Sequence, residues 1–472
     1  MMLTTIGLAI LVLIAVEAPS GSQPAGESVA VSVYYQAERQ VTFSPKNHDL
    51  DNNDNFSRDS RFLCYDTRGT VGPGIENGQT VEKVEIATGI ETVLYKPSAS
   101  VTGEKAAPGV GAASFSPVDN KVVFIHGPPL DEVAERGYYG KPNRNGVEVV
   151  ADGSGEFVWL DKRDTATTRD TTPGAHRGGT HRHEYTLDGR RIGFTYDDAL
   201  LPQYDRTVGY MEEHRDAPAG ATHYFALLVP VVPKGTAKPG EIERAWGDSW
   251  VGAKGLMRAF IGKVRAADGV SYEESLFVVD VPADVDITTS DSGSAIRFPN
   301  RPEGVSVRRL THTYAEGVVR GSVKGDRIAY YGLDEAGRKQ VFIIPSDGSD
   351  RHENPGKRPV QATRFQHGAG PGLRWHPSGN AIACVSNNGV AVTCVKPGPG
   401  FGKTMFLTAQ GDEPERINLV WSPDGKLLAF NKRVPTTDEN GKRAYAYDEQ
   451  DFLQIFLVDY PDQDGDGIVS SR

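Results

Sequence analysis

The segment His181-Arg182-His183 places two imidazoles two residues apart, the spacing that puts both side chains on one face of a β-strand. Two other groups able to transfer protons, His126 and Tyr196, come at the ends of other strand-like runs. A histidine and a tyrosine can serve as base and acid, while an arginine can bind and neutralise a carboxylate. These residue types predict chemistry on an acidic substrate, although two histidines on one strand could instead ligate a metal ion.

A short repeated pattern indicates which elements carry these residues. Each copy has an aromatic residue, a turn similar to Ser-Pro-Asp-Gly, and an alternating apolar strand, which together form a β-hairpin. Two hairpins make one four-stranded blade, so the sequence predicts an all-β propeller of seven blades, with six and eight as alternatives. The aromatic residues of the five clearest copies are Phe56, Phe115, Tyr185, Trp375 and Trp421.

The two ends of the repeat region predict how the ring closes. The last blade ends with the strand-like run 454–459 and lacks an outermost strand, while residues 39–43 resemble the outer strands of other blades. We expect this N-terminal strand to complete the last blade, which removes an exposed sheet edge. The propeller is therefore expected to span residues 38–460.

A comparison of the copies with one another shows which positions depart from the repeat. The residues two and four before the turn aromatic are small or apolar in most copies, but polar in the first and third blades. In a hairpin, the start of the first strand lies beside the end of the second, and in a propeller these ends surround one mouth of the channel. We expect the following side chains to converge there: Asp54, Arg68, His126, His181, His183 and Tyr196.

Two long segments are expected to cover the same mouth. Residues 127–145 contribute Tyr139, and residues 197–222 contribute Arg206. The glycine-rich segment 174–180 leads into the two histidines, and its glycines should allow the backbone to approach a ligand closely.

The composition and the two ends of the chain indicate which partners the protein can bind and where it acts. A net charge of −11 argues against a nucleic-acid partner, and three cysteines with no close spacing do not form a disulfide framework. An apolar run over residues 6–16 predicts a signal peptide within residues 1–25, hence a secreted or periplasmic protein with no membrane contact after cleavage. Residues 461–472 are expected to form a solvated acidic tail, with a calcium loop, whose oxygen spacing they share, as the alternative.

The Ser-Pro-Asp-Gly-like repeats resemble the TolB-type propeller superfamily. The segments 124–128, 177–183, 194–198 and 250–252 are similar to secreted TolB-like proteins of bacteria. The chain also resembles the propeller-fold polysaccharide lyases, in particular the ulvan lyases of family 25, which use His, Tyr and Arg at the channel mouth. This resemblance implies a monomeric enzyme that cleaves an anionic, uronate-containing polysaccharide by β-elimination.

A uronate lyase must neutralise the C6 carboxylate, remove the C5 proton and protonate the leaving O4. On this hypothesis His126 and Tyr196 form the acid–base pair, with either residue as the base, and His183 and Arg206 hold the carboxylate. The substrate subsites would be lined by Asp54, Arg68, Tyr139, Arg177 and His181. The chemistry needs no cofactor, and a structural Ca²⁺ or another bound divalent metal is left as an alternative. The alternatives are a non-catalytic propeller that binds a protein partner and a metal-dependent hydrolase.

Overall fold

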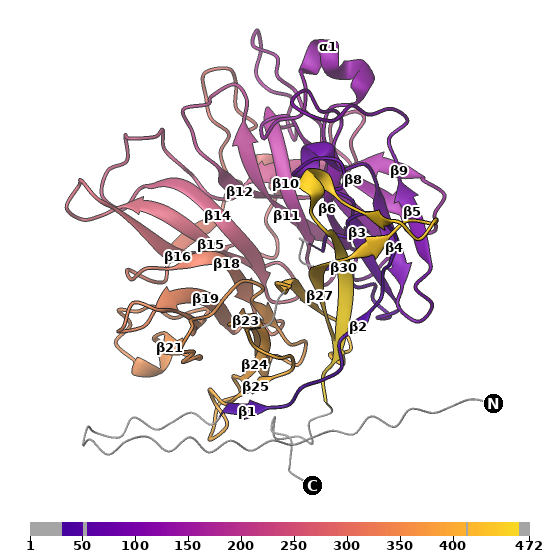
Figure 1. Cartoon of the computed structure of the whole chain (residues 1–472). Coiled ribbons are helices and arrows are strands. Elements are labelled where there is room, and N and C mark those ends of the chain that lie inside the picture. The colour runs from indigo at the N-terminus through magenta and orange to yellow at the C-terminus, as the bar shows by residue number, and fades with distance from the viewer. Residues whose placement is uncertain (1–30, 51–53, 412–413, 462–472) are drawn as a thin grey trace.

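The computed structural model describes residues 31–50, 54–411 and 414–461, and these residues form a seven-bladed β-propeller (Figure 1). The predicted signal peptide and most of the predicted acidic tail lie outside the described residues. Within them, helix is limited to the single turn α1 (Val133–Arg136) and five short 3-10 turns. No helix of the described part is long and apolar enough to cross a membrane.

The first three blades follow one another along the chain, and each adds its strands outward from the channel. Blade 1 contains β3 (Phe62–Asp66), β4 (Val81–Glu85) and β5 (Glu91–Tyr95). Blade 2 contains β6 (Val110–Phe115), β7 (Lys121–His126), β8 (Asn145–Val150) and β9 (Phe157–Trp159). Blade 3 contains β10 (Gly178–Tyr185), β11 (Arg191–Asp198), β12 (Thr207–Glu213) and β13 (His223–Leu227).

The next three blades repeat this order. Blade 4 contains β14 (Ile242–Val251), β15 (Met257–Arg265), β16 (Tyr272–Asp280) and β17 (Ser306–Arg309). Blade 5 contains β18 (Glu316–Gly321), β19 (Arg327–Leu333), β20 (Lys339–Pro345) and β21 (Val360–Gln361). Blade 6 contains β22 (Arg374–Trp375), β23 (Ala381–Ser386), β24 (Gly389–Cys394) and β25 (Thr404–Phe406).

The seventh blade confirms the predicted closure by an N-terminal strand. It contains β26 (Ile417–Trp421), β27 (Leu427–Val434), β30 (Phe452–Asp459) and, at its outer edge, β2 (Arg39–Gln40). The antiparallel pairing of β2 with β30 appears in Figure 1 as indigo beside yellow. The chain also adds an unexpected strand, β1 (Val31–Val33), parallel to β25 on blade 6.

The repeated turn forms for a local chemical reason. In blade 7 the Ser422 hydroxyl donates to Asp424 (2.6 Å) and accepts from the Leu427 backbone N–H (2.9 Å). Gly425 then takes a positive φ of 73°, a conformation that costs glycine little. Thr186, Asp188 and Gly189 make the same turn in blade 3. The turn chemistry is contained in five or six consecutive residues, so the sequence reveals each hairpin directly.

Inner strands carry a bulge that the repeat pattern does not show. In five blades, the residue three positions before the aromatic residue at the turn has a positive φ. In four of these blades the register of the strand pair shifts at this residue. These residues are Ala112, Arg182, Gly247, Gly372 and Asn418. A bulge adds one residue to a strand, so side chains on its two sides no longer follow simple alternation.

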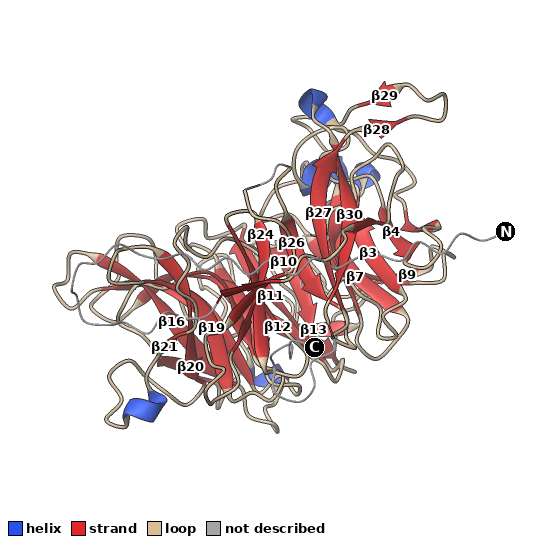
Figure 2. Cartoon of the chain, turned by 60° about the horizontal axis from the view of Figure 1, so that its bottom comes forward, coloured by secondary structure: helices blue, strands red, loops and turns tan. Residues whose placement is uncertain are grey.

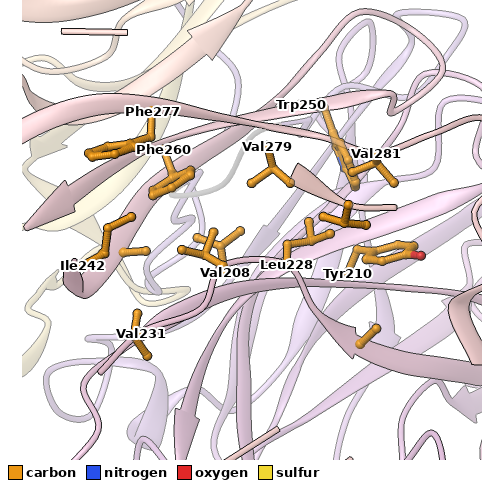
Figure 3. Packing of buried hydrophobic residues seen from close by; sticks show 14 of the residues in the cluster. Val208, Tyr210, Leu228, Val231, Ile242, Trp250, Phe260, Phe277, Val279 and Val281 are labelled. Atoms are coloured by element: carbon orange, nitrogen blue, oxygen red, sulfur yellow. The ribbon is translucent and has the colours of Figure 1, made fainter. Parts of the chain in front are cut away.

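The hydrophobic core lies between neighbouring blades. The largest cluster joins blades 3 and 4 and is shown in Figure 3, where Val208 and Leu228 pack near Phe260 and Val279. Several long loops, including residues 127–144, lie on the side of the ring where α1 lies. There the ribbon of β28 (Thr436–Thr437) and β29 (Arg443–Ala444) projects beyond β27 and β30 (Figure 2). We call this side the α1 face.

Candidate functional site at the α1 face

His126 lies at the end of β7 but does not reach the channel mouth. It is 2% exposed, and its ring packs at 5.0 Å from the Trp159 ring. Its Nδ1 donates to the Gly127 carbonyl oxygen (2.5 Å), and its Nε2 pairs with the Tyr95 hydroxyl (2.9 Å). Burial lowers the pKa of His126 to about 4. The prediction that His126 faces the channel is therefore wrong, because its side chain fills a space between the outer strands of blades 1 and 2.

Tyr196 and Arg177 belong to a buried ion-pair network rather than to an open pocket. Arg177 Nη2 lies 2.6 Å from Asp198 Oδ2, with neither side chain exposed, and the Tyr196 hydroxyl donates to the same oxygen (2.9 Å). Arg177 also donates to the backbone carbonyls of Ser294 and Arg297. Burial and the Asp198 charge raise the pKa of the Tyr196 phenol well above its usual range.

This network fastens a loop of blade 4 to blade 3. Residues 281–305 connect β16 to β17 and include the 3-10 turn Ile287–Thr289. The loop also accepts a backbone hydrogen bond from Thr171 at Gly293, and its Phe298 stacks on Tyr204 at 4.1 Å. Tyr196 and His126 thus contact different parts of the protein and do not form the expected acid–base pair. Arg177 anchors a loop instead of lining a subsite.

His183 occupies a core position. The matching residues of other blades, Ala113, Leu373 and Leu419, are all buried hydrophobics, and His183 is itself 0% exposed. Its Nε2 bonds to Thr180 Oγ1 (3.1 Å), which in turn donates to Asp161 (2.7 Å).

Burial lowers the pKa of His183 to about 4. The bulge at Arg182 separates the surroundings of His183 from those of His181, so the two imidazoles do not form the predicted pair. Among the described residues, no three His, Cys, Asp or Glu side chains gather closely enough to hold a metal ion.

Arg68 lies near the α1 face as expected but is held in an ion pair, whereas Asp54 does not lie at that face. Arg68 is bound by Asp66 at 2.6 Å, and Asp66 accepts the backbone N–H of the bulge residue Ala112 (2.7 Å). Arg68 thus helps to hold blade 1 against blade 2. Asp54 lines the channel together with Ser322 and Val323, which belong to a turn at the end opposite to the α1 face.

Three predicted residues do gather at the α1 face. His181 is partly exposed, and its pKa is lowered far below 6.5 by burial and by the positive charges of Arg144, Arg206 and Arg182. Its Nδ1 has no hydrogen-bond partner. Tyr139 lies in the same group, with its ring centroid 5.9 Å from the Arg144 guanidinium.

Asp197 holds the arginines of this group in place. Its Oδ2 lies 2.7 Å from Arg206 Nη2 and 3.4 Å from Arg144 Nη2. Two guanidinium groups therefore share one carboxylate oxygen, which leaves the group with a surplus of positive charge. We name Tyr139, Arg144, His181, Asp197 and Arg206 the arginine mouth.

The glycine-rich segment has a different role from the one expected. A Cβ placed on Gly179 would lie 2.2 Å from the Lys141 carbonyl oxygen, so the loop 141–144 passes directly over β10. The Thr180 backbone N–H also donates to the Arg144 carbonyl oxygen (3.3 Å). Gly179 allows the protein's own loop, rather than a ligand, to approach, and this contact brings Arg144 to His181.

The sequence analysis did not identify Arg144 and Asp197, although their positions in the sequence indicated a place at the mouth. Asp197 follows Tyr196 in a strand, so its side chain must point away from that of Tyr196. Because Tyr196 is buried, Asp197 is the residue that faces the mouth. Arg144 lies in the segment expected to cover this face.

Residues 109–219 match the protein family described as "Protein of unknown function (DUF3748)". Uncharacterized protein YidR of Escherichia coli (strain K12) is 32% identical over 436 residues, which cover 85% of this chain and 97% of YidR. The chain belongs to the YidR family. The segment 109–219 contains every residue of the arginine mouth of this YidR-family protein.

Solved structures similar to this YidR-family chain include proteins of several kinds. The chain is 12% identical to a prolyl endopeptidase (TM-score 0.48), with 88% of this chain and 51% of that chain covered. It is 11% identical to a putative TolB from Agrobacterium tumefaciens (TM-score 0.35; 79% and 95% covered). It is 13% identical to an oligogalacturonate lyase in complex with manganese (TM-score 0.39; 92% and 97% covered). TolB-like neighbours are thus found, whereas the expected resemblance to ulvan lyases is not shown.

Proposed function

We propose that this protein is a lyase that cleaves uronate-containing, anionic polysaccharides at the arginine mouth. The observation that carries the proposal is His181, a partly exposed residue surrounded by arginines, whose Nδ1 is buried and has no hydrogen-bond partner. A basic patch on an acidic protein also favours the approach of a polyanion. An extracytoplasmic location, periplasmic or secreted, suits such a substrate.

The chemistry of β-elimination assigns a role to each group. Arg144 and Arg206 would bind the C6 carboxylate of the uronate, which makes the C5 proton more acidic. Neutral His181 would accept that proton, the C5–H electron pair would form the C4=C5 bond, and the C4–O4 bond would break. Tyr139, whose pKa is raised by burial, would be protonated at neutral pH and could protonate the departing O4. No cofactor takes part in these proposed reaction steps.

The direct test is a panel of polymers. We expect ulvan, pectate, alginate or a glycosaminoglycan to yield the ultraviolet absorbance of an unsaturated uronate when incubated with the purified protein. Binding of a polymer without any absorbance change would favour a non-catalytic propeller instead. Activity that is lost with a chelator and restored by zinc or manganese would favour a metal-dependent enzyme.

The pH dependence tests the protonation state of His181. Because its pKa is held well below 6.5, the base is already neutral at pH 7, and activity is lost only when acid protonates it. We therefore expect the acidic limb of kcat/KM against pH to have its midpoint well below pH 6.5. Arg144→Gln removes one positive neighbour, so it should move this midpoint to higher pH. A wild-type midpoint at or above 6.5 would contradict the assignment of His181.

A further inference from the structure

A second polar cavity lies at the opposite end of the channel. It has a volume of about 140 Å³, room for about four water molecules or one small organic anion. Inner strands of blades 3, 4, 5 and 6, together with Asp54 of blade 1, contribute its walls. The polar side chains that line it include Asp54, Glu184, Ser249, Arg320 and Arg374.

Arg320 is the unusual member of this cavity. It is only 5% exposed, and its Nε donates to the Leu373 carbonyl oxygen (3.1 Å). Its Nη1 is buried and has no hydrogen-bond partner. No carboxylate of the described residues forms a salt bridge with it. A buried guanidinium donor without an acceptor is costly, and an anion in the cavity would supply the acceptor.

The nearby carboxylate of Glu184 is already occupied by blade 4. It accepts hydrogen bonds from Arg258 (3.0 Å), Ser249 (3.1 Å) and the Trp250 backbone N–H (3.3 Å). Arg258 in turn binds Asp248 at 2.5 Å. Glu184 is therefore held toward Arg258, and Arg320 is left to a ligand.

Asp54 completes the cavity with a group that can donate a proton. Burial and the charge of Glu184 raise its pKa to about 7, against the opposing effect of Arg320 and Arg374. Among the described residues, the Cys64 thiol also lies close to Asp54, and burial keeps this thiol neutral. Near neutral pH, Asp54 can thus offer an O–H to a bound anion.

We propose that this cavity binds a small monocarboxylate, with its oxygens on Arg320 and on the carboxylic acid of Asp54. The two arginines exclude a cation, and the carboxyl groups of Asp54 and Glu184 disfavour a dianion. The indoles of Trp250 and Trp375, which also line the cavity, would contact the apolar part of the ligand. This site is independent of the lyase activity proposed for the arginine mouth.

Binding should be coupled to uptake of a proton. When Asp54 is ionised it repels the ligand, so affinity should rise as pH falls through 7. For a pKa of about 7, the neutral fraction of Asp54, and with it the apparent affinity, rises about tenfold from pH 8 to pH 6.

Calorimetric titration of the whole protein with sodium acetate, at pH 6 and at pH 8, tests the proposal. We expect acetate to bind more tightly at pH 6, Arg320→Gln to abolish binding, and Asp54→Asn to bind acetate equally at both pH values. Arg206→Gln, a control at the arginine mouth, should keep the wild-type affinity and pH dependence.

Three outcomes would overturn the proposal: no acetate binding at pH 6, unchanged binding by Arg320→Gln, or tighter binding of inorganic phosphate than of acetate. Loss of acetate binding in Arg206→Gln alone would place the acetate at the other mouth, which also overturns it. If Arg320→Gln does not fold, acetate binding by Asp54→Asn tests the proposal instead. If Asp54→Asn still binds acetate more tightly at pH 6 than at pH 8, the role of Asp54 is rejected.

Discussion

If the protein is the lyase that we propose, a His181→Gln variant will lose between about 100-fold and 10,000-fold of kcat, the range typical of removing a general base. Glutamine keeps the size and polarity of the side chain but cannot accept the C5 proton. The neighbouring arginines still bind the carboxylate, so KM should change less than kcat. The measurement is steady-state kinetics on whichever uronate polymer gives the unsaturated product.

His126→Asn is the matched control for this loss. His126 is buried and bonded to Tyr95 and Gly127, so its replacement should lower stability but leave kcat close to wild type in the folded protein. Circular dichroism and the thermal midpoint would verify the fold of both variants. The reverse result, an active His181→Gln and an inactive but folded His126→Asn, would reject the arginine mouth and restore the original acid–base hypothesis.

Arg177→Leu will destabilise the propeller by about 3–5 kcal/mol, the usual cost of breaking a buried ion pair by removing one partner. Asp198 would be left buried without its guanidinium, and the carbonyls of Ser294 and Arg297 would each lose one of two donors, keeping only the backbone hydrogen bonds that they make with each other. Urea-induced unfolding measures this change. Adding Asp198→Asn to the variant should recover part of the loss, because it removes the uncompensated charge.

Arg297→Gln is the control for Arg177→Leu. Arg297 pairs with Asp291 at 2.6 Å and Asp170 at 3.2 Å, but its side chain is 51% exposed. Exposed pairs contribute little, so the free energy of unfolding should change by less than about 1 kcal/mol. If Arg177→Leu were equally mild and instead weakened polymer binding, the earlier hypothesis of a substrate subsite at Arg177 would be supported.

The arginine mouth and the cavity around Arg320, which we propose to bind a monocarboxylate, lie at opposite ends of one channel, and the repeat explains why. Residues before the bulge, such as His181, lie toward the α1 face, whereas Glu184 and Arg320 follow it near the turns. The innermost strands of the blades thus supply polar groups to both ends of the channel. The proposed tests separate them, because Arg206→Gln and Arg320→Gln should each affect one end alone.

Local chemistry explains why so much of the fold was predictable. The turn built by Ser422, Asp424 and Gly425 needs no distant partner, and strand alternation is visible along the chain. Counting hairpins therefore predicted seven blades correctly. The unpaired outer edge of blade 7 correctly predicted the strand that pairs with β30.

The site was only partly predictable, because it depends on one backbone angle and on contacts between distant segments. Arg182 has a φ of 62°, and this bulge breaks the alternation that would have placed His181 and His183 together. A trace of the bulge is present in the sequence, since Gly247, Gly372 and Asn418, residue types that tolerate positive φ, recur at the same position.

The sequence by itself indicated a ring of about seven blades and marked its first and third blades as unusually polar, because turns and alternation are local properties of the chain. Only the tertiary structure decided which polar groups face the channel. Arg144 reaches His181 because loop 141–144 crosses Gly179, and Arg177 is buried because a loop from blade 4 covers it. Such contacts join residues that are far apart in sequence, and their energies depend on burial that no repeat pattern records.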